Sequence, residues 1–356
     1  MEILIITGLY PPLKCGVGDY TQELAKSLNS NGNSVSVLSL FSPKTPNNIS
    51  GIKLLKGITR WNFLSLFTIV RLIKKCSPDV IHIQYPNDAF YKSFSYSLIP
   101  LISFFLRKKV ILTWHESFSL SSLFKFLFLA IVPSQIVVVR PNYRKLLPFY
   151  KFLVFYKDFN FIPNASTIPE IRLSGSKKNA LRKKYLLGQN RLIVYFGFIF
   201  PHKGVENLFK IANPKTDQIV IAADFDHKID YHRNIKSLIV KKWKGKVSIL
   251  NYMDAIDLGT LLSIADAIVL PFKDGGGLWN TSIHAAVSSR SFLLTTSLTV
   301  NGFNKNLNTY YSKVNDVNEM KIALNKYSGT INLNKKVSGS TSWNEISKKH
   351  LLVYSK

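Results

Sequence analysis

Residues 2–29 read EILIITGLYPPLKCGVGDYTQELAKSLN, which is an apolar run, a glycine-bearing loop and an amphipathic stretch in succession. The run Glu2–Gly8 is almost continuously apolar, which predicts a strand covered on both faces. In Asp19–Asn29, apolar residues follow one another every fourth position from Tyr20, which predicts a helix with Asp19 as its N-cap. Strand, tight loop and helix in this order are typical of doubly wound parallel sheets.

The same alternation continues through the first 140 residues, breaks, and then starts again. The break is Phe161–Glu170 (FIPNASTIPE) with a basic Ser/Lys stretch through Lys184, which we expect to be a polar linker. The repetition predicts an α/β protein of two similar domains, 1–165 and 166–340, and a C-terminal helix in 341–356. Further strands are expected at Ser34–Phe41, Val80–Gln84, Lys109–Thr113, Ser134–Val139, Leu192–Gly197, Gln218–Ala223, Val247–Leu250 and Ala267–Leu270, and further helices at Lys203–Ala212, Asp254–Ala265, Asn280–Val287 and Thr341–Tyr354.

Composition excludes several classes of protein. The 356 residues are 46% hydrophobic and 19% charged, which is enough for large cores and excludes a mainly disordered chain. Two cysteines, Cys15 and Cys76, exclude a disulfide scaffold and a cysteine-rich zinc module. The N-terminal MEILIITGLYPP lacks the basic start and the cleavage site of a signal peptide, so we expect a reducing, cytoplasmic setting.

The charge balance is strongly basic. Lysine and arginine number 47 against 20 aspartate and glutamate, a formal net charge of +27 that is spread along the whole chain. Such a field attracts nucleic acid, an anionic membrane face or phosphorylated small molecules, and charge alone does not choose among them.

Two apolar segments raise the question of a membrane. Phe94–Leu106 is short and contains Pro100, and Ser119–Val139 is interrupted by Lys125 and Pro133, whereas a membrane span needs about 20 nearly unbroken apolar residues. One interpretation is two core helices of the first domain; the other is a peripheral contact with anionic lipid. The basic residues that would flank such a contact are Arg71, Lys74, Lys75, Arg107, Lys108 and Lys109.

Ligands of open parallel sheets bind beyond the carboxyl ends of the strands, so the loops after strands are the candidate site. In Leu9–Gly18, Gly16 and Gly18 would let a ligand approach the backbone, or would simply form a tight turn. His115 directly follows a strand and is either a cleft residue or a satisfied structural histidine. His82 lies inside VIHIQ and is expected to be buried packing.

Two further loops belong to the second domain. Lys203 in GFIFPHKG follows a strand and opens a helix, so its ammonium could reach a phosphate, or could be one surface lysine among many. Pro271–Ala286 (PFKDGGGLWNTSIHAA) leads three glycines into a helix start, where free backbone N–H groups, hydroxyls and the helix dipole would cradle a diphosphate, unless the loop is merely flexible.

Metal binding has little support in the sequence. Asp224 and Asp226 form an Asp-x-Asp pair after a strand, which is a weak match to a divalent metal site. No other cluster has ligand spacing, so no metal ligand and no cofactor are expected.

These loops in this order resemble family 4 glycosyltransferases of the GT-B architecture over nearly the whole chain. YPPLKCGVGDYTQELAKSL is similar to the family's opening glycine loop and helix, and FIPNAS to its Pro-Asn-Gly linker. YFGFIFPHKGVENL, NYMDAIDLGTLLSIADAIVLPF and DGGGLWNTSIHAAVSSRSFLLTT follow the order of its donor domain. TSWNEISKKHLLVY is similar to the final helix that crosses back to the first domain.

The resemblance implies two Rossmann-like domains facing across a cleft and a retaining, metal-independent transfer of sugar from a nucleoside-diphosphate sugar. His115 and Lys203 match the family's catalytic positions. The donor-binding positions that the resemblance implies are Gly16, Val17, Gly18, Asn164, Gly197, Lys203, Asp274, Gly275, Gly276, Gly277, Asn280, Thr281, Ser282 and His284.

Two positions depart from the family pattern. Its pair of glutamates, which have seven residues between them, falls on Gly276 and His284, and the arginine before the lysine falls on Phe198, which is typical of a variant branch.

The leading hypothesis is an enzyme of surface polysaccharide synthesis (O-antigen, capsule or lipopolysaccharide type) with a glycan or lipid-linked acceptor, held at the cytoplasmic face of an anionic plasma membrane. One alternative is a non-catalytic protein of this fold that binds glycans or partners. The other is a nucleic-acid-binding protein, which rests on charge alone, and nucleic acid is not an expected partner.

Overall fold

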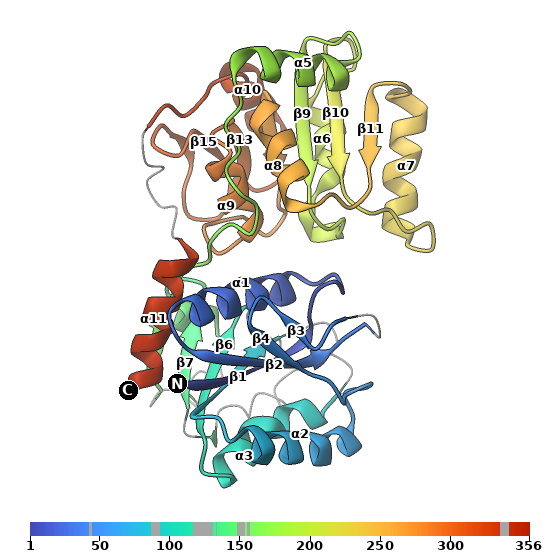
Figure 1. The fold of residues 1–356 in the computed structure, drawn as a ribbon. Coiled ribbons are helices and arrows are strands. Elements are labelled where there is room, and N and C mark those ends of the chain that lie inside the picture. Colours follow the sequence, from blue (N-terminus) through green and yellow to red (C-terminus); the bar gives the residue numbers. More distant parts are fainter. Residues whose placement is uncertain are drawn as a thin grey trace. The chain divides into compact units, whose positions relative to one another are not determined.

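The computed structural model describes residues 1–42, 45–86, 93–116, 131–132, 134–147, 154, 157–334 and 342–356. The chain forms two compact units (Figure 1). Unit 1 is Met1–Asn164 with Thr341–Lys356, and unit 2 is Ala165–Ser340. Each has its own sheet and its own hydrophobic core.

Unit 1 is built on one sheet. Its strands, as far as the described residues go, have the order β3-β4-β2-β1-β5-β6-β7-β8, and all neighbours are parallel except β3 and β4. The elements are β1 Glu2–Leu9, α1 Gly16–Ser30, β2 Ser34–Leu40, β3 Asn48–Ile49, β4 Ile52–Leu55, α2 Phe63–Cys76, β5 Val80–Tyr85, the 3-10 turn η2 Ser95–Leu98, α3 Ile99–Phe105, β6 Lys109–Trp114, β7 Gln135–Val138, the 3-10 turn η4 Tyr143–Leu146, β8 Phe159–Phe161 and α11 Trp343–Ser355.

Unit 2 repeats the plan. Its strand order is β11-β10-β9-β12-β13-β15-β14 over the described residues, with only β14 antiparallel. The elements are α5 Gly175–Leu186, β9 Arg191–Phe196, the 3-10 turns η6 Pro201–Lys203 and η7 Val205–Asn207, α6 Leu208–Ile211, β10 Asp217–Ala222, α7 Asp230–Lys242, β11 Val247–Leu250, α8 Ala255–Ile264, β12 Ala267–Leu270, α9 Thr281–Ser288, β13 Leu293–Ser297, β14 Gly302–Asn304, β15 Thr309–Lys313 and α10 Val317–Tyr327.

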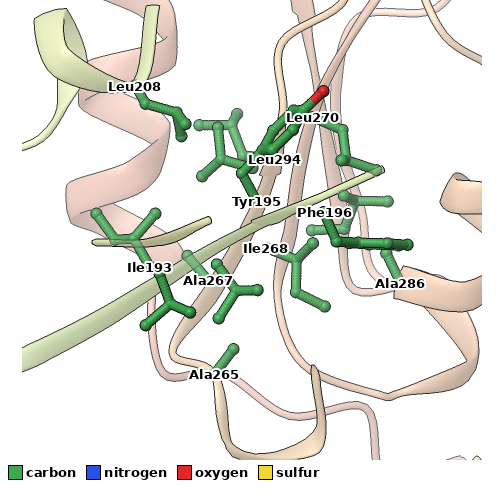
Figure 2. Close-up of a cluster of buried hydrophobic side chains, with 14 of the residues drawn as sticks. Ile193, Tyr195, Phe196, Leu208, Ala265, Ala267, Ile268, Leu270, Ala286 and Leu294 are labelled. Carbon is green, nitrogen blue, oxygen red and sulfur yellow. The ribbon is translucent and has the colours of Figure 1, made fainter. Parts of the chain in front are cut away.

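Both orders are doubly wound. The first strand of each unit, β1 or β9, lies inside its sheet, and the chain builds outward on one side before it returns to the other. The predicted fold class of two doubly wound α/β units is therefore confirmed. The central strands of unit 2 are buried runs such as LIVYF, and Figure 2 shows Ile193, Tyr195 and Ile268 among the side chains of that core.

Helices cover both faces of the unit 1 sheet. In Figure 1, α1 lies on one face and α2 and α3 on the other. The C-terminal helix α11 packs beside α1, where Ser27 Oγ lies 2.8 Å from Ser347 Oγ. Trp343, Ile346, His350 and Tyr354 recur at helical spacing in the sequence, and the last three are buried.

Three expectations about local structure were wrong. Helix α1 starts at Gly16 with Cys15 as N-cap, so Asp19 lies in its first turn and caps nothing. The basic stretch before Lys184 is not simply a linker, because it contains the exposed helix α5. The expected helix Lys203–Ala212 is split into η6, η7 and the short α6, because Gly204 has a left-handed φ of 66°.

The two apolar segments have different outcomes. Phe94–Leu106 contains η2 and α3, whose buried residues include Ile99 and Ser103 but whose Phe105 is 73% exposed. Most of Ser119–Val139 lies outside the described residues, and its end forms β7. Within the described part of the chain, no helix combines the length and the apolar character needed to cross a membrane.

Candidate functional site

The strand order fixes where a ligand site should be sought. In a doubly wound sheet, ligands bind beyond the carboxyl ends of the strands at the point where the order reverses. That point lies between β1 and β5 in unit 1 and between β9 and β12 in unit 2. The loops after these strands contain most of the residues singled out from the sequence.

In unit 2 the loops after β9 and β12 are locked together. The backbone N–H of Lys273 donates to the carbonyl of His202 at 2.8 Å. A Cβ on Gly204 would lie 2.2 Å from the carbonyl oxygen of Pro271, so only glycine permits this approach at its positive φ. The turn that carries Lys203 is therefore held in a fixed position beside the glycine loop.

Lys203 lies over that loop. Its Nζ is 4.5 Å from the ring centroid of Phe272, which is a cation–π arrangement. Phe272 in turn packs on Gly276, where a Cβ would come within 2.6 Å of its ring and 2.7 Å of Ile283. The structure thus brings together Lys203 and the Gly275–Gly277 loop, and the position expected for a family glutamate has no room for a side chain.

The glycine loop makes its own hydrogen bonds. Gly276 N–H donates to the carbonyl of Thr296 at 2.7 Å, and Gly277 N–H donates to Oδ1 of Asn280 at 3.1 Å. These two N–H groups are therefore already used within unit 2. They shape the loop, and Gly275, with a φ of 73°, turns it.

The free donors lie one step further, at the start of α9. Asn280 is the N-cap but its side chain points back to Gly277. In the described part of the chain, neither the N–H nor the hydroxyl of Thr281 and Ser282 has a hydrogen-bond partner. A helix start with free N–H groups and hydroxyls attracts anions, and the helix dipole adds to this.

The remaining donor-binding candidates differ in whether a ligand could reach them. Gly197, with a φ of 105°, and Asp274 are exposed. His284 is buried and its Nε2–H donates to the carbonyl of Leu278 at 2.5 Å, while burial lowers its pKa, so this histidine is neutral and supports the loop. Asn164 is buried at the end of unit 1.

Sequence reasoning missed an aromatic stack beside Lys203. The rings of Phe198 and Phe200 are 5.8 Å apart and those of Phe200 and His202 5.6 Å apart, both stacked. Phe198 and Phe200 are 46% and 42% exposed. The alternation F-x-F-x-H after a strand is a signal that could have revealed this stack.

In unit 1 the loop after β1 leads into α1. Gly18 is required, because a Cβ would lie 2.7 Å from the carbonyl oxygen of Leu9, whereas Gly16 is exposed with open space around it. Val17 is half-buried, and its carbonyl accepts from Thr21 Oγ1. Burial, with Glu23 nearby, raises the pKa of Asp19 to about 6.

His115 lies at the neighbouring strand end. Its backbone N–H donates to the carbonyl of Tyr85 at 2.8 Å, and its Nε2 lies 2.8 Å from Oε1 of Gln84. The Tyr20 ring meets it edge-on at 4.8 Å. Burial lowers the pKa of His115 to about 3, with His350 contributing, so the imidazole is neutral at physiological pH.

The Asp-x-Asp pair has a local structural role. Asp224 Oδ1 accepts from the N–H of Tyr252 and Asp226 Oδ1 from that of Lys228. Among the described residues no three His, Cys, Asp or Glu side chains are grouped to hold a metal ion. A hollow of about 590 Å³ near Arg191 and Asp217 lies at the amino ends of β9 and β10, the opposite edge from the loops above.

Comparison with solved structures identifies the class of fold. Sucrose-phosphate synthase from Thermosynechococcus elongatus is 15% identical with a TM-score of 0.76, covering 99% of this chain and 98% of its own. Anabaena HepE in complex with UDP and glucose is 14% identical with a TM-score of 0.76, covering 100% and 99%. WaaG, a glycosyltransferase involved in lipopolysaccharide biosynthesis, is 13% identical with a TM-score of 0.61, covering 99% and 96%. The chain therefore has the GT-B fold of glycosyltransferases.

Part of the chain also matches a family model. Residues 15–153 match Glycosyltransferase Family 4. This match and the shared fold confirm the predicted resemblance to family 4 glycosyltransferases. No curated protein matches the chain.

Proposed function

We propose that this protein is a retaining glycosyltransferase that moves a sugar from a nucleoside-diphosphate sugar to a glycan or lipid-linked acceptor of a surface polysaccharide, without an obligatory metal. One observation carries the proposal: Lys203 and the start of α9, whose first donors have no partner among the described residues, both belong to the loops at the switch point of unit 2. Lys203 contacts the Phe272 ring, and Gly276 packs between that ring and Ile283 of α9. Family 4 similarity in unit 1 and the complex of HepE with UDP and glucose support it.

The proposed chemistry is the stabilisation of a leaving diphosphate. Negative charge develops on the nucleoside diphosphate as the glycosidic bond breaks, and preorganised donors favour that charge most. Lys203 supplies the ammonium, and Thr281 and Ser282 supply N–H and hydroxyl donors. In this proposal His115, being neutral, contributes a hydrogen bond at the sugar and neither a proton nor a positive charge.

A thermal-shift screen over nucleoside-diphosphate sugars tests the donor site. A donor at 100 times its Kd should stabilise the protein by about 2.7 kcal/mol. Lys203→Ala should weaken donor binding by roughly 10- to 100-fold, the value of a charge-assisted hydrogen bond. Lys210→Ala is the matched control, because Lys210 is an exposed lysine on α6. Absence of binding to every donor, or equal loss in both variants, would contradict the proposal.

Two further measurements test whether the enzyme retains the anomeric configuration and whether it needs a metal. NMR of the product's anomeric proton should show the configuration of the donor sugar, and inversion would refute a retaining enzyme. Addition of EDTA should leave the rate unchanged.

We also propose that unit 1 binds the anionic inner face of the plasma membrane. Helix α2 exposes Phe63, Leu64 and Phe67 at 59%, 73% and 77%. Arg71, Lys74 and Lys75, at its other end, are also exposed. Exposed apolar side chains beside basic ones are typical of a helix that rests on anionic lipid.

Vesicle co-sedimentation tests this partner. We expect binding to phosphatidylglycerol vesicles and little to phosphatidylcholine vesicles. Phe67→Ser should weaken binding by roughly 10-fold, as about one buried aromatic side chain is lost. Leu352→Ser, at an apolar residue of α11 that is 67% exposed, should leave binding unchanged. Equal binding to both lipids would contradict the proposal.

A further inference from the structure

A layer of polar side chains is buried on one face of the unit 1 sheet. His82 and Gln84 of β5 and Thr113 of β6 are fully buried, and His115 is 8% exposed. His82 and Gln84 are two positions apart, as are Thr113 and His115, so the side chains of each pair point to the same face of the sheet. Tyr20 of α1 and His350 and Tyr354 of α11 pack against this layer: Tyr20 contacts His115 and His350, and Tyr354 contacts His82.

His82 is fixed by in-plane partners. Its Nδ1 lies 2.6 Å from the hydroxyl of Tyr354 on α11, and its Nε2 lies 2.7 Å from Oγ1 of Thr113. The amide nitrogen of Gln84 lies 3.1 and 3.4 Å from the two ring nitrogens, so it sits over the face of the ring. The His82 ring thereby acts as a platform that orients the Gln84 amide.

That orientation decides where His115 carries its proton. The Gln84 atom that faces His115 is Oε1, which only accepts hydrogen bonds, so the hydrogen belongs to His115 Nε2. A neutral imidazole has one N–H, and Nδ1 therefore keeps its lone pair. Nδ1 has no hydrogen-bond partner among the residues that the structure describes.

A second contact reaches His115 from α11. His350 Nε2 lies 3.3 Å from the hydroxyl of Tyr20, and the Tyr20 ring meets the His115 ring at 4.8 Å. The His350 ring is itself held in place, because its Nδ1–H donates to the carbonyl of Ile346 at 3.0 Å. Both Gln84 and Tyr20, the two contacts of His115, are therefore linked to the C-terminal helix.

We propose that Gln84 is a positioning residue for His115 and that α11 acts through it, by way of Tyr354 and His82. The arrangement holds His115 as the Nε2–H tautomer and presents the Nδ1 lone pair to a hydroxyl of the ligand. This inference rests on the proposed function only for the identity of that ligand. The tautomer itself can be observed without any substrate.

The direct test is nitrogen NMR of the full-length protein labelled with ¹⁵N-histidine, with the His115 signals assigned by His115→Gln. We expect the Nε2–H tautomer of His115 in the wild type at pH 7. An Nδ1–H tautomer would overturn the proposal. This readout is independent of activity, so it separates a failure of the inference from a failure of the proposed function.

Gln84→Glu makes the test sharper, because it keeps the shape and replaces the amide NH2 by a charged oxygen. The groups that face His115 are Tyr20 from α1, His350 from α11 and His82 from β5; burial lowers the pKa of both histidines and raises that of Tyr20, so none is charged at pH 7. A carboxylate at this distance should raise the pKa of His115 by about 1–3 units. An unchanged His115 titration would overturn the role of Gln84.

Tyr354→Phe tests the contribution of α11, and Ser347→Ala is its control. Each removes one hydroxyl from the same helix, but Ser347 bonds to Ser27 and Asn31 and not to the polar layer. We expect the His115 nitrogen signals to shift in Tyr354→Phe and to stay in Ser347→Ala. The same shift in both, or in neither, would remove α11 from the proposal.

Activity gives the last comparison, once a donor is found. Gln84→Met, which loses the acceptor but keeps the volume, should lower kcat by up to about 100-fold, the effect of a misoriented group. KM for the donor should change little, because the diphosphate contacts lie in unit 2. A rise in KM with kcat unchanged would mean that Gln84 serves binding and not His115.

Discussion

The two units share a strand order but fill their sheets with different chemistry. In unit 2 a large cluster of buried apolar residues surrounds the central strands, and the candidate ligand contacts are a lysine and a helix start at the sheet edge. In unit 1 the apolar cluster includes residues of α2 and α3, such as Ile69 and Ile99, while the face under α1 and α11 contains a polar layer beside apolar residues such as Leu24. The same scaffold therefore carries candidate anion contacts in one unit and a fixed, neutral imidazole in the other.

Acidification should separate the two units most strongly. An unfolded histidine binds a proton near pH 6.5, whereas burial lowers the pKa of His350 to about 4 and that of His115 to about 3 and also lowers that of His82. Below pH 6.5 the unfolded state of unit 1 therefore holds more protons. Its free energy of unfolding should fall by up to about 1.4 kcal/mol per pH unit for each histidine, until the folded pKa is reached.

Pulse-labelling hydrogen exchange, after incubation between pH 7 and 4, measures this difference. Unit 1 peptides should become exchangeable at a higher pH than unit 2 peptides. In unit 2 burial lowers the pKa of His284 and of the partly buried His202, neither of which is as deeply buried as the three histidines of unit 1. Simultaneous unfolding of both units would break the comparison.

Gly204→Ala should be the most damaging single change in the unit 2 loops. The left-handed φ costs an alanine about 1–2 kcal/mol, and the clash with Pro271 adds to this, so a loss of about 3 kcal/mol is expected. Gly188→Ala is the control, since Gly188 has a φ of 83° but nothing within 4 Å of its Cβ. Urea denaturation should show a loss of about 1–2 kcal/mol for the control. Equal losses would show that the close contact between Gly204 and Pro271 adds nothing to the free energy of unfolding.

Two threonine substitutions, one in each unit, compare the interiors of the two units, and we expect smaller losses of stability from them. Thr113→Val leaves a ring nitrogen of buried His82 without its partner and should cost about 2 kcal/mol. Thr295→Val in unit 2 removes only a bond to the backbone carbonyl of Leu270 and should cost about 1 kcal/mol or less. Denaturant midpoints of the two variants measure the difference, and a larger loss for Thr295→Val would reverse the interpretation of the polar layer.

Much of the fold could be predicted because strand and helix periodicity are local. The runs at Val80–Gln84 and Ala267–Leu270 are strands as expected, and Asp254 caps α8 through its side chain. A mostly exposed element escaped prediction: α5 buries none of its residues fully and packs on the core only through the partly buried Leu181, Tyr185 and Leu186. The position of Asp19 was misjudged because the helix start was set by the approach of Gly18 to Leu9, a contact that periodicity does not report.

The candidate site was predictable as a set of loops but not as a set of bonds. Lys203, Gly276 and Thr281 could be singled out because glycines and a helix start follow strands. That the N–H groups of Gly276 and Gly277 are already used, and that His284 supports the loop, depends on which backbone atoms come within 3 Å. Gln84 and Tyr354 escaped notice for the same reason.

The sequence by itself determined the two α/β units, the loops at their switch points and the basic charge, since these depend on the order and spacing of residue types. Only the tertiary structure decided that His82, Gln84 and His115 form one buried layer with Tyr354, which is 272 residues from His82 along the chain. Hydrogen bonds depend on distances of about 3 Å between atoms, and for residues so far apart in sequence those distances exist only after the sheet and its covering helices have packed.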